Sequence, residues 1–121
     1  MVLADMEAGL GIMTRMKEGH VDHVLVVTEP SWKAIEVGQR AVTLARESGV
    51  GQVFVVANRV RDDQQTTMVR EAFPTEEILV VPEDESIRLA DLRGVAPIDA
   101  APESAGVVAL TAVVKRLINE Q

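Results

Sequence analysis

The sequence predicts an α/β fold in three layers, in which helices cover both faces of a mostly parallel sheet. Four short apolar segments recur along the chain: VLA at 2–4, VLVV at 24–27, VFVVA at 53–57 and ILVV at 78–81. They are continuous rather than alternating and rich in β-branched residues, which is typical of strands buried on both faces. Helical patterns separate the last three segments, and this alternation predicts parallel strands joined by right-handed crossovers.

The composition predicts one domain with an aliphatic core. A chain of 121 residues suits a single domain, and hydrophobic residues make up 47% of it while aromatic residues make up only 2%. The core must therefore be built from Val, Leu, Ile and Ala. The absence of cysteine excludes a disulfide, a thiolate metal site and a cysteine nucleophile.

Charge and hydropathy predict a cytoplasmic protein without nucleic-acid or membrane partners. The formal net charge of −7 disfavours electrostatic binding to phosphate backbones and anionic lipids. The N-terminus lacks the charged-then-apolar layout of a signal peptide, and no apolar run approaches the roughly 20 residues needed to span a bilayer. We therefore expect the chain to act in the cytoplasm.

Residues 30–49 predict a helix of about 18 residues between the second and third strands. Pro30 suits its first turn, and Gly49 suits its C-terminal end. The apolar positions at helical spacing are Ala34, Val37, Ala41, Leu44 and Ala45.

Three further helices are predicted along the rest of the chain. Residues 62–73 form a weaker helix that one of its first two aspartates caps and Pro74 ends. Its inward positions are Met68, Val69, Ala72 and Phe73. DESIRLADLRG is a short helix closed by Gly94, and a long amphipathic helix starts near Pro102.

Ligand sites of parallel sheets lie at the carboxyl ends of the strands, in the loops that follow. The first loop, DMEAGLG, begins with Asp5. An aspartate that ends a buried strand can hold magnesium through water, and a glycine a few residues later lets the backbone approach a terminal phosphate. Alternatively, the segment is an ordinary polar turn that follows a strand.

The third and fourth loops carry candidates for binding a nucleobase. Asn58 ends a buried strand, and its amide offers a donor and an acceptor to a base edge. The alternative is a turn asparagine that bonds its own backbone. Pro82, Glu83 and Asp84 can wall a flat pocket, or can be an ordinary helix start with Asp84 as the cap.

Two other features have simpler explanations than a ligand site. His20 and His23 are three residues apart, but they lie where a loop enters a strand, so we expect surface or packing histidines rather than metal ligands. Trp32, in the first turn of the long helix, is expected to be a packing residue or an interface anchor.

Four segments taken in order resemble one protein family. VLADMEAGLG, VDHVLVVTEPSWKAIEVGQRAVTLA, VFVVANRV and VVPEDESIRLADLRGVAP are similar to the C-terminal half of the MinD/ParA-type deviant-Walker P-loop ATPases. The likeness is strongest to the CooC-type accessory ATPases of carbon-monoxide dehydrogenase maturation. It covers essentially the whole chain and implies a Rossmann-like fold, with ATP and Mg²⁺ as the cofactors of the complete family.

The resemblance implies roles for residues of the first loop. Asp5 corresponds to the Walker B aspartate that supports the magnesium ion. Residues 6–11 correspond to the switch segment that senses the terminal phosphate. The implied catalytic residues are Asp5, Glu7 and Gly9, with Asp5 as the metal residue.

The resemblance also implies a base-binding side. Asn58 corresponds to the base-contacting asparagine of the family, with Arg59 beside it. Pro82, Glu83 and Asp84 correspond to the second side of the adenine pocket.

One part of the family pattern is missing from the 121 residues. The family binds phosphates with a glycine-rich loop that carries a lysine and a Ser or Thr, whereas neither GLGIMT nor GVGQVF is followed by such a pair. Without those groups, nothing stabilises the negative charge that develops on the phosphate during hydrolysis. We therefore expect residues 1–121 to be a single, partial nucleotide-binding-type domain that lacks the Walker A half, binds no cofactor tightly and does not hydrolyse ATP alone.

Three hypotheses follow. The chain is descended or cut from such an ATPase, as a shortened gene product or through a mispredicted start codon. Alternatively, it is a non-catalytic interaction module, or a separate chain carrying the glycine-rich loop restores an ATPase in trans.

The missing strand predicts assembly. In the family, the strand of the phosphate loop lies between the Walker B strand and the strand that matches 24–27, so its absence leaves an unpaired edge. We expect residues 2–4 to pair directly with 24–27 or, preferably, a homodimer formed through strand edges or exchanged N-terminal segments. A different protein partner is a further possibility.

Overall fold

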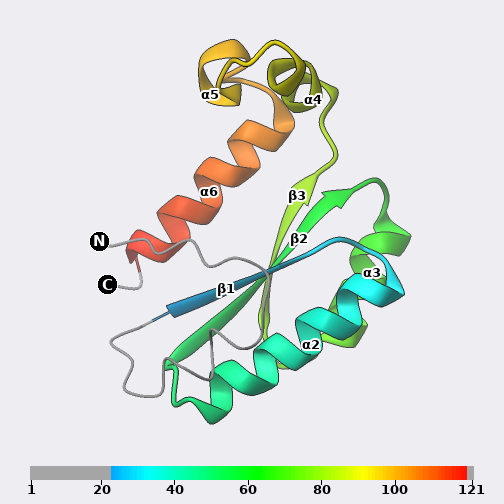
Figure 1. Cartoon of the computed structure of the whole chain (residues 1–121), viewed down its shortest axis with the longest axis vertical. Coiled ribbons are helices and arrows are strands. Elements are labelled where there is room, and N and C mark those ends of the chain that lie inside the picture. Colours follow the sequence, from blue (N-terminus) through cyan, green and yellow to red (C-terminus); the bar gives the residue numbers. More distant parts are fainter. Residues whose placement is uncertain (1–22, 120–121) are drawn as a thin grey trace.

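The computed structural model describes residues 23–119 as a parallel three-stranded sheet with helices on both faces (Figure 1). The strand order is β1-β2-β3, and both pairings are parallel, as the alternation of strands and helices predicted. The predicted strand at 2–4 lies outside the described residues. The elements in chain order are β1 (His23–Thr28), α2 (Trp32–Glu47), β2 (Gln52–Val60), α3 (Asp63–Ala72), β3 (Glu77–Pro82), α4 (Glu85–Leu92), α5 (Pro97–Ala100) and α6 (Ala105–Asn119).

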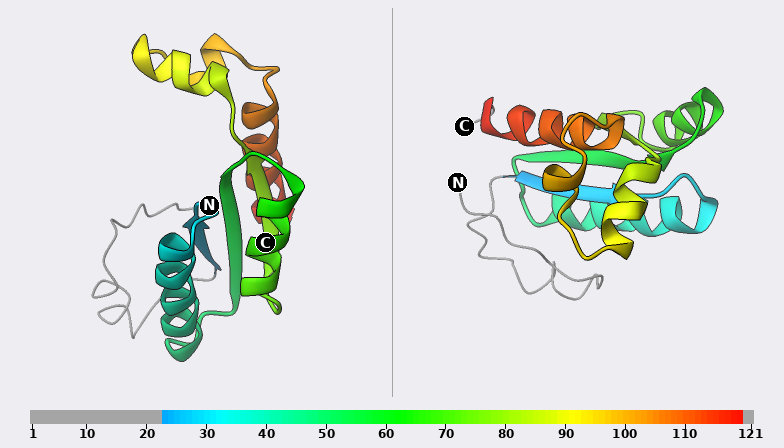
Figure 2. Two further views of the ribbon diagram at one scale, coloured as in Figure 1. Left: turned by 90° about the vertical axis from the view of Figure 1, so that its right-hand side faces the viewer. Right: turned by 90° about the horizontal axis from the view of Figure 1, so that it is seen from above.

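The central strand β2 supplies side chains to a core on each face of the sheet. Val53 and Val55 point into the core that α2 and α3 cover, whereas Phe54 and Val56 point into the core that α6 covers. Figure 2 shows α2 and α6 on opposite sides of the sheet. All four side chains are buried, because a strand between two layers is excluded from water on both faces. The predicted three-layer α/β arrangement is confirmed.

Helix α2 begins later than predicted. Ser31 has an extended backbone and its hydroxyl accepts a hydrogen bond from the Ala34 N–H at 3.3 Å, so Ser31 is the N-cap. Pro30 therefore precedes the cap, and its predicted place in the first turn was wrong, because a serine can satisfy a free helix N–H and a proline cannot. Gly49 ends the helix with a φ of 79°, as predicted.

The buried face of α2 is turned slightly from the predicted one. Val37 is 50% exposed, and the predicted Ala34, Ala41 and Leu44 are only partly buried. The fully buried positions are Ile35, Gly38, Val42 and Ala45.

The later helices follow the predicted caps but not every predicted start. Asp62 caps α3, with its carboxylate 2.8 Å from the Gln65 N–H, and Gly94 follows α4 with a φ of 68°. Helix α6 begins at Ala105 rather than near Pro102. No helix within 23–119 is long and apolar enough to cross a membrane.

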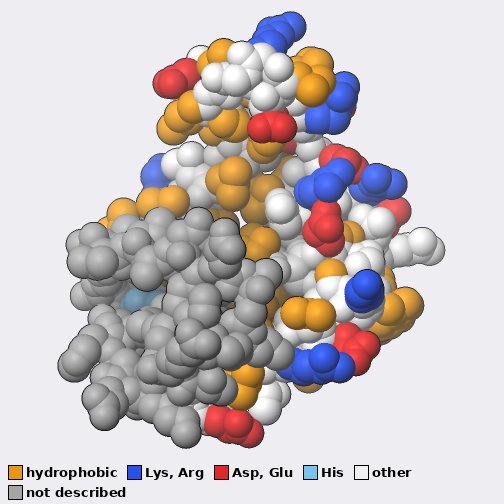
Figure 3. Space-filling view, viewed as in Figure 1, with side chains coloured by type: hydrophobic (Ala, Val, Ile, Leu, Met, Phe, Trp, Pro, Cys, Tyr) orange, Lys and Arg blue, Asp and Glu red, His pale blue; other side chains and the backbone are white. Residues whose placement is uncertain are grey.

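The short helix α5 was not predicted, since four residues give no readable helical pattern. It starts with Pro97 at its first position and stands with α4 away from the sheet (Figure 1). Figure 3 shows hydrophobic side chains at this end of the molecule, where Leu92 and Ile98 are 69% and 62% exposed.

Candidate nucleotide-base site

The carboxyl ends of the three parallel strands meet at one edge of the sheet, which is where such sheets bind ligands. This edge carries Glu29 after β1, Asn58 and Arg59 near the end of β2, and the Pro82–Asp84 segment at the end of β3. All the predicted base-side residues are therefore brought to one place. The predicted phosphate-side residues, Asp5, Glu7 and Gly9, lie outside the described part of the chain.

A β-bulge interrupts β2 at the candidate site. Ala57 pairs with Val80 and Val60 pairs with Pro82, so three steps along β2 face two steps along β3. The extra residue bends the strand locally and re-aims the side chains beside it. Arg59 lies inside the bulge with a φ of 60°, a conformation that side chains other than glycine seldom adopt.

Asn58 lies at the start of this bulge with its side chain half-buried. No residue between 23 and 119 forms a hydrogen bond with its amide, so the self-bonded turn asparagine is not seen there. A half-buried amide with a free donor and a free acceptor can pair with a complementary polar edge.

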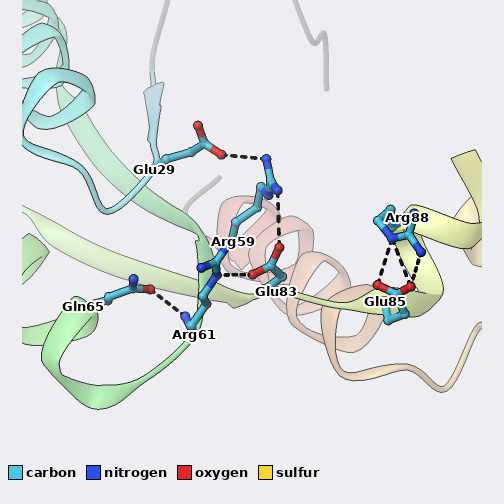
Figure 4. Close-up of polar contacts among 7 residues, drawn as sticks. All are labelled: Glu29, Arg59, Arg61, Gln65, Glu83, Glu85 and Arg88. Carbon is cyan, nitrogen blue, oxygen red and sulfur yellow. Dashed lines mark hydrogen bonds and ion pairs between the residues drawn. The ribbon is translucent and has the colours of Figure 1, made fainter.

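Charged side chains connect the three strand ends (Figure 4). The Arg59 guanidinium lies 3.0 Å from a Glu29 carboxylate oxygen and 3.3 Å from a Glu83 oxygen, and Arg61 Nε lies 2.5 Å from the other Glu83 oxygen. The hydrogen bonds from Arg61 and Arg59 lower the pKa of Glu83. The hydrogen bond to Glu83 and the charge of Glu29 raise the pKa of Arg59. Both shifts favour the charged forms of Glu83 and Arg59.

Glu29 and Arg61 were not among the predicted site residues. Each lies next to a strand end, but nothing in the local sequence shows that they share a network through Arg59 and Glu83. The available signal was position: residues that follow neighbouring parallel strands come close together, and opposite charges there pair readily.

Asp84 is the N-cap of α4, one of the two roles that the sequence left open. One carboxylate oxygen accepts the Ser86 N–H at 2.8 Å, and the other accepts the Gly106 N–H of α6 at 2.7 Å. These bonds, that of Gly106 foremost, lower the pKa of Asp84. The carboxylate therefore fastens the end of β3 to the beginning of two helices.

We expect Gly106→Ala to destabilise the fold, although alanine favours helices. A β-carbon at this position would lie 2.6 Å from Ile87 Cδ1 and 2.9 Å from Asp84 Cβ, so α6 must shift away from Asp84. Such overpacking reduces the free energy of unfolding by about 1–3 kcal/mol, which urea denaturation measures. Gly38→Ala is the control, because its β-carbon would come no closer than 3.1 Å to another atom, that of the Phe73 side chain, with Val26 at 3.5 Å and Thr28 at 3.6 Å. A Gly106→Ala protein as stable as the original would contradict the close packing.

Other regions provide weaker candidates for a site. Within 23–119, no group of three or more His, Asp or Glu side chains is placed to hold a metal, and the His23 ring packs 6.1 Å from the Phe54 ring. Trp32 is 72% exposed, so it is not a core residue of the described part, and the interface role remains. An open depression of about 430 Å³ lies on α2, but none of its lining residues belongs to the strand ends.

Comparison with known proteins relates the chain to ATP-binding proteins. It is 30% identical over 96 residues to an uncharacterized ATP-binding protein of Methanocaldococcus jannaschii, which covers 77% of this chain and 37% of that protein. It is 28% identical over 102 residues to the carbon monoxide dehydrogenase accessory protein CooC of Rhodospirillum rubrum, covering 84% and 39%. A second uncharacterized ATP-binding protein of M. jannaschii is 24% identical over 93 residues, covering 77% and 37%.

These similarities cover most of the chain but less than two fifths of each relative. No protein-family model matches the sequence. The parallel sheet flanked by helices is a Rossmann-like arrangement of the kind that P-loop NTPases contain. Sequence and fold together indicate a P-loop ATPase-like relationship.

Proposed function

We propose that this chain forms the base-binding half of a nucleotide site of the MinD/ParA type, nearest in kind to CooC. The observation that carries the proposal is the half-buried Asn58 amide, which has no hydrogen-bond partner among residues 23–119. It stands at the carboxyl end of the central strand, beside the Pro82–Asp84 segment. An adenine edge offers the donor and acceptor that such an amide can pair with.

The described residues suit a base better than a triphosphate. The carboxylates of Glu29 and Glu83 already occupy the Arg59 guanidinium, and they would repel a second anion. In the proposal, the triphosphate and Mg²⁺ belong to the side of the site that carries Asp5, with Glu7 and Gly9 in the switch segment. ATP hydrolysis further requires a glycine-rich loop with its lysine, which residues 1–121 do not contain. Alone, the chain binds ATP·Mg²⁺ weakly and does not hydrolyse it.

The proposal predicts that Asn58→Ala weakens nucleotide binding more than Asp5→Ala does. Loss of one base-edge hydrogen bond of about 1 kcal/mol lowers affinity roughly fivefold. Isothermal titration with millimolar ATP and Mg²⁺ measures the dissociation constants of the original protein and of the two variants. Equal losses in the two variants would indicate a phosphate-led mode and contradict the base-led one.

A second candidate is a non-catalytic interaction module that assembles through strand edges. It is favoured by the position of β1 at the end of the sheet, where no strand within 23–119 pairs with its outer edge. Near this edge Val27 is 61% exposed, and Trp32, just beyond it, is 72% exposed. Exposed strand edges and exposed tryptophans are both common in protein interfaces.

This candidate predicts a homodimer formed through β1 edges or through exchange of N-terminal segments. Light scattering at several concentrations should show twice the chain mass, and deletion of residues 1–12 should change the size of the assembly. A monomer at every concentration would contradict this candidate. A dimer that persists both after the deletion and in a Val27→Asp variant would contradict it as well. Val37→Asp is the control, because Val37 is similarly exposed but lies on helix α2 rather than on the edge strand.

A further inference from the structure

Arg59 has a backbone conformation that its local sequence does not favour. Within 23–119 it is the one non-glycine residue with a positive φ, and it occupies a bulge position where glycine is common. An arginine persists in such a conformation only where the surrounding structure holds it. The contacts of its side chain are therefore what hold Arg59 in this conformation.

The Arg59 side chain spans the loops on both sides of β2. One terminal nitrogen contacts Glu29 after β1 at 3.0 Å, and the other contacts Glu83 after β3 at 3.3 Å. Arg61 makes a second contact to Glu83, and the Glu83 N–H donates to the Val60 carbonyl at 2.9 Å. A single guanidinium thus ties together the ends of all three strands (Figure 4).

We infer that Arg59 is a positioning residue of the proposed base site, which fixes the direction of the Asn58 amide. This inference rests on the proposed function. Asn58 immediately precedes Arg59 in the bulge, so the peptide that sets the Asn58 side-chain direction is held by the Arg59 contacts. Rotation of that peptide would also move the Arg59 guanidinium away from Glu29 or Glu83.

Positioning explains the arrangement better than direct ligand contact. Both terminal nitrogens of Arg59 already face carboxylates, and a ligand anion would have to displace at least one of them. A neutral base beside Asn58 need displace neither. The network is largely exposed, with the Arg59 side chain 57% accessible, so water and salt screen it and its role is local geometry rather than global stability.

The test compares four variants of the whole chain, with adenosine as the probe; the fourth is a Glu29→Gln, Glu83→Gln double variant. Arg59→Gly suits a φ of 60° and removes both ion pairs, and Glu29→Gln removes one charge. Arg40→Met is the matched control, because Arg40 forms an exposed ion pair with Glu36 on α2. Two quantities are measured: the adenosine dissociation constant, and the side-chain ¹⁵N amide signal of Asn58 in the free protein.

We expect Arg59→Gly to keep or raise the melting temperature, since glycine favours this backbone conformation. Its adenosine affinity should fall about fivefold, equivalent to the loss of one well-placed hydrogen bond, and its Asn58 amide signal should shift without ligand. Glu29→Gln should show a smaller change of the same kind. Arg40→Met should show neither.

Two outcomes would overturn the positioning role. One is an Arg59→Gly protein whose Asn58 signal and adenosine affinity match the original. The other is a Glu29→Gln, Glu83→Gln double variant that keeps full affinity while Arg59→Gly loses it, because Arg59 would then contact adenosine directly. If the original chain binds no adenosine, the proposed function fails, whereas the Asn58 signal of the free proteins still tests the positioning.

Discussion

Replacement of Phe54 by alanine should reduce the free energy of unfolding by about 3–5 kcal/mol. Phe54 is fully buried on β2, in the core that β3 and α6 complete with Val81, Val113 and Leu117. The Arg116 guanidinium also lies over its ring, 5.3 Å from the centroid. The other apolar side chains of this core are Val, Leu and Ala, which relax only partly into the cavity that the substitution leaves.

Urea denaturation measures this loss, and Trp32→Ala provides an aromatic control. Trp32 is 72% exposed, so its replacement should change stability by roughly 0.5 kcal/mol or less. Since a domain of this size is stable by only about 5–15 kcal/mol, Phe54→Ala should leave a marginal protein. A larger loss from Trp32→Ala than from Phe54→Ala would contradict the described core.

Replacement of Asp84 by asparagine should lower the melting temperature at pH 7 by about 5 °C. Both carboxylate oxygens accept backbone N–H groups, from Ser86 and from Gly106. Asparagine provides one acceptor, and its NH₂ group must face one of those donors. Asp62→Asn is the control, since Asp62 caps α3 through one oxygen and asparagine caps as well as aspartate.

The same contacts predict how stability depends on pH. Folding lowers the pKa of Asp84, so its contribution is present above the ordinary value of 3.8 and is lost as the pH falls through the lower folded value. Melting temperatures measured between pH 7 and pH 2 should therefore converge for the original and Asp84→Asn proteins in acid. A difference that persists unchanged at pH 2 would show that the carboxylate charge is not responsible.

Much of the sheet was predictable because its signals are local. Continuous runs of β-branched residues identified β1, β2 and β3, and each observed strand contains its predicted apolar core. Gly49 and Gly94 follow helix ends as expected, because glycine has no β-carbon and adopts a positive φ without steric cost. The start of α2 was predicted too early, at Pro30, because the serine immediately after it is the better cap.

The candidate site was less predictable because its contacts join distant segments. Asn58 and Pro82–Asp84 were identified by family resemblance and strand position, and the fold places them at one edge. The Glu29–Arg59–Glu83 network depends on a bulge that no local pattern announces. The Asp84–Gly106 contact depends on where α6 begins. That position could not be predicted, because α6 follows the unpredicted helix α5.

We propose that this chain recognises the base of a nucleotide rather than its phosphates. The most direct test is the ratio of the dissociation constants for adenosine and for ATP·Mg²⁺, measured on the same preparation at physiological salt. We expect ATP·Mg²⁺ to bind no more than about threefold more tightly than adenosine, a difference below 1 kcal/mol, because Glu29 and Glu83 already occupy Arg59. Binding of ATP·Mg²⁺ a hundredfold more tightly than adenosine, or no binding of adenosine at all, would contradict the claim.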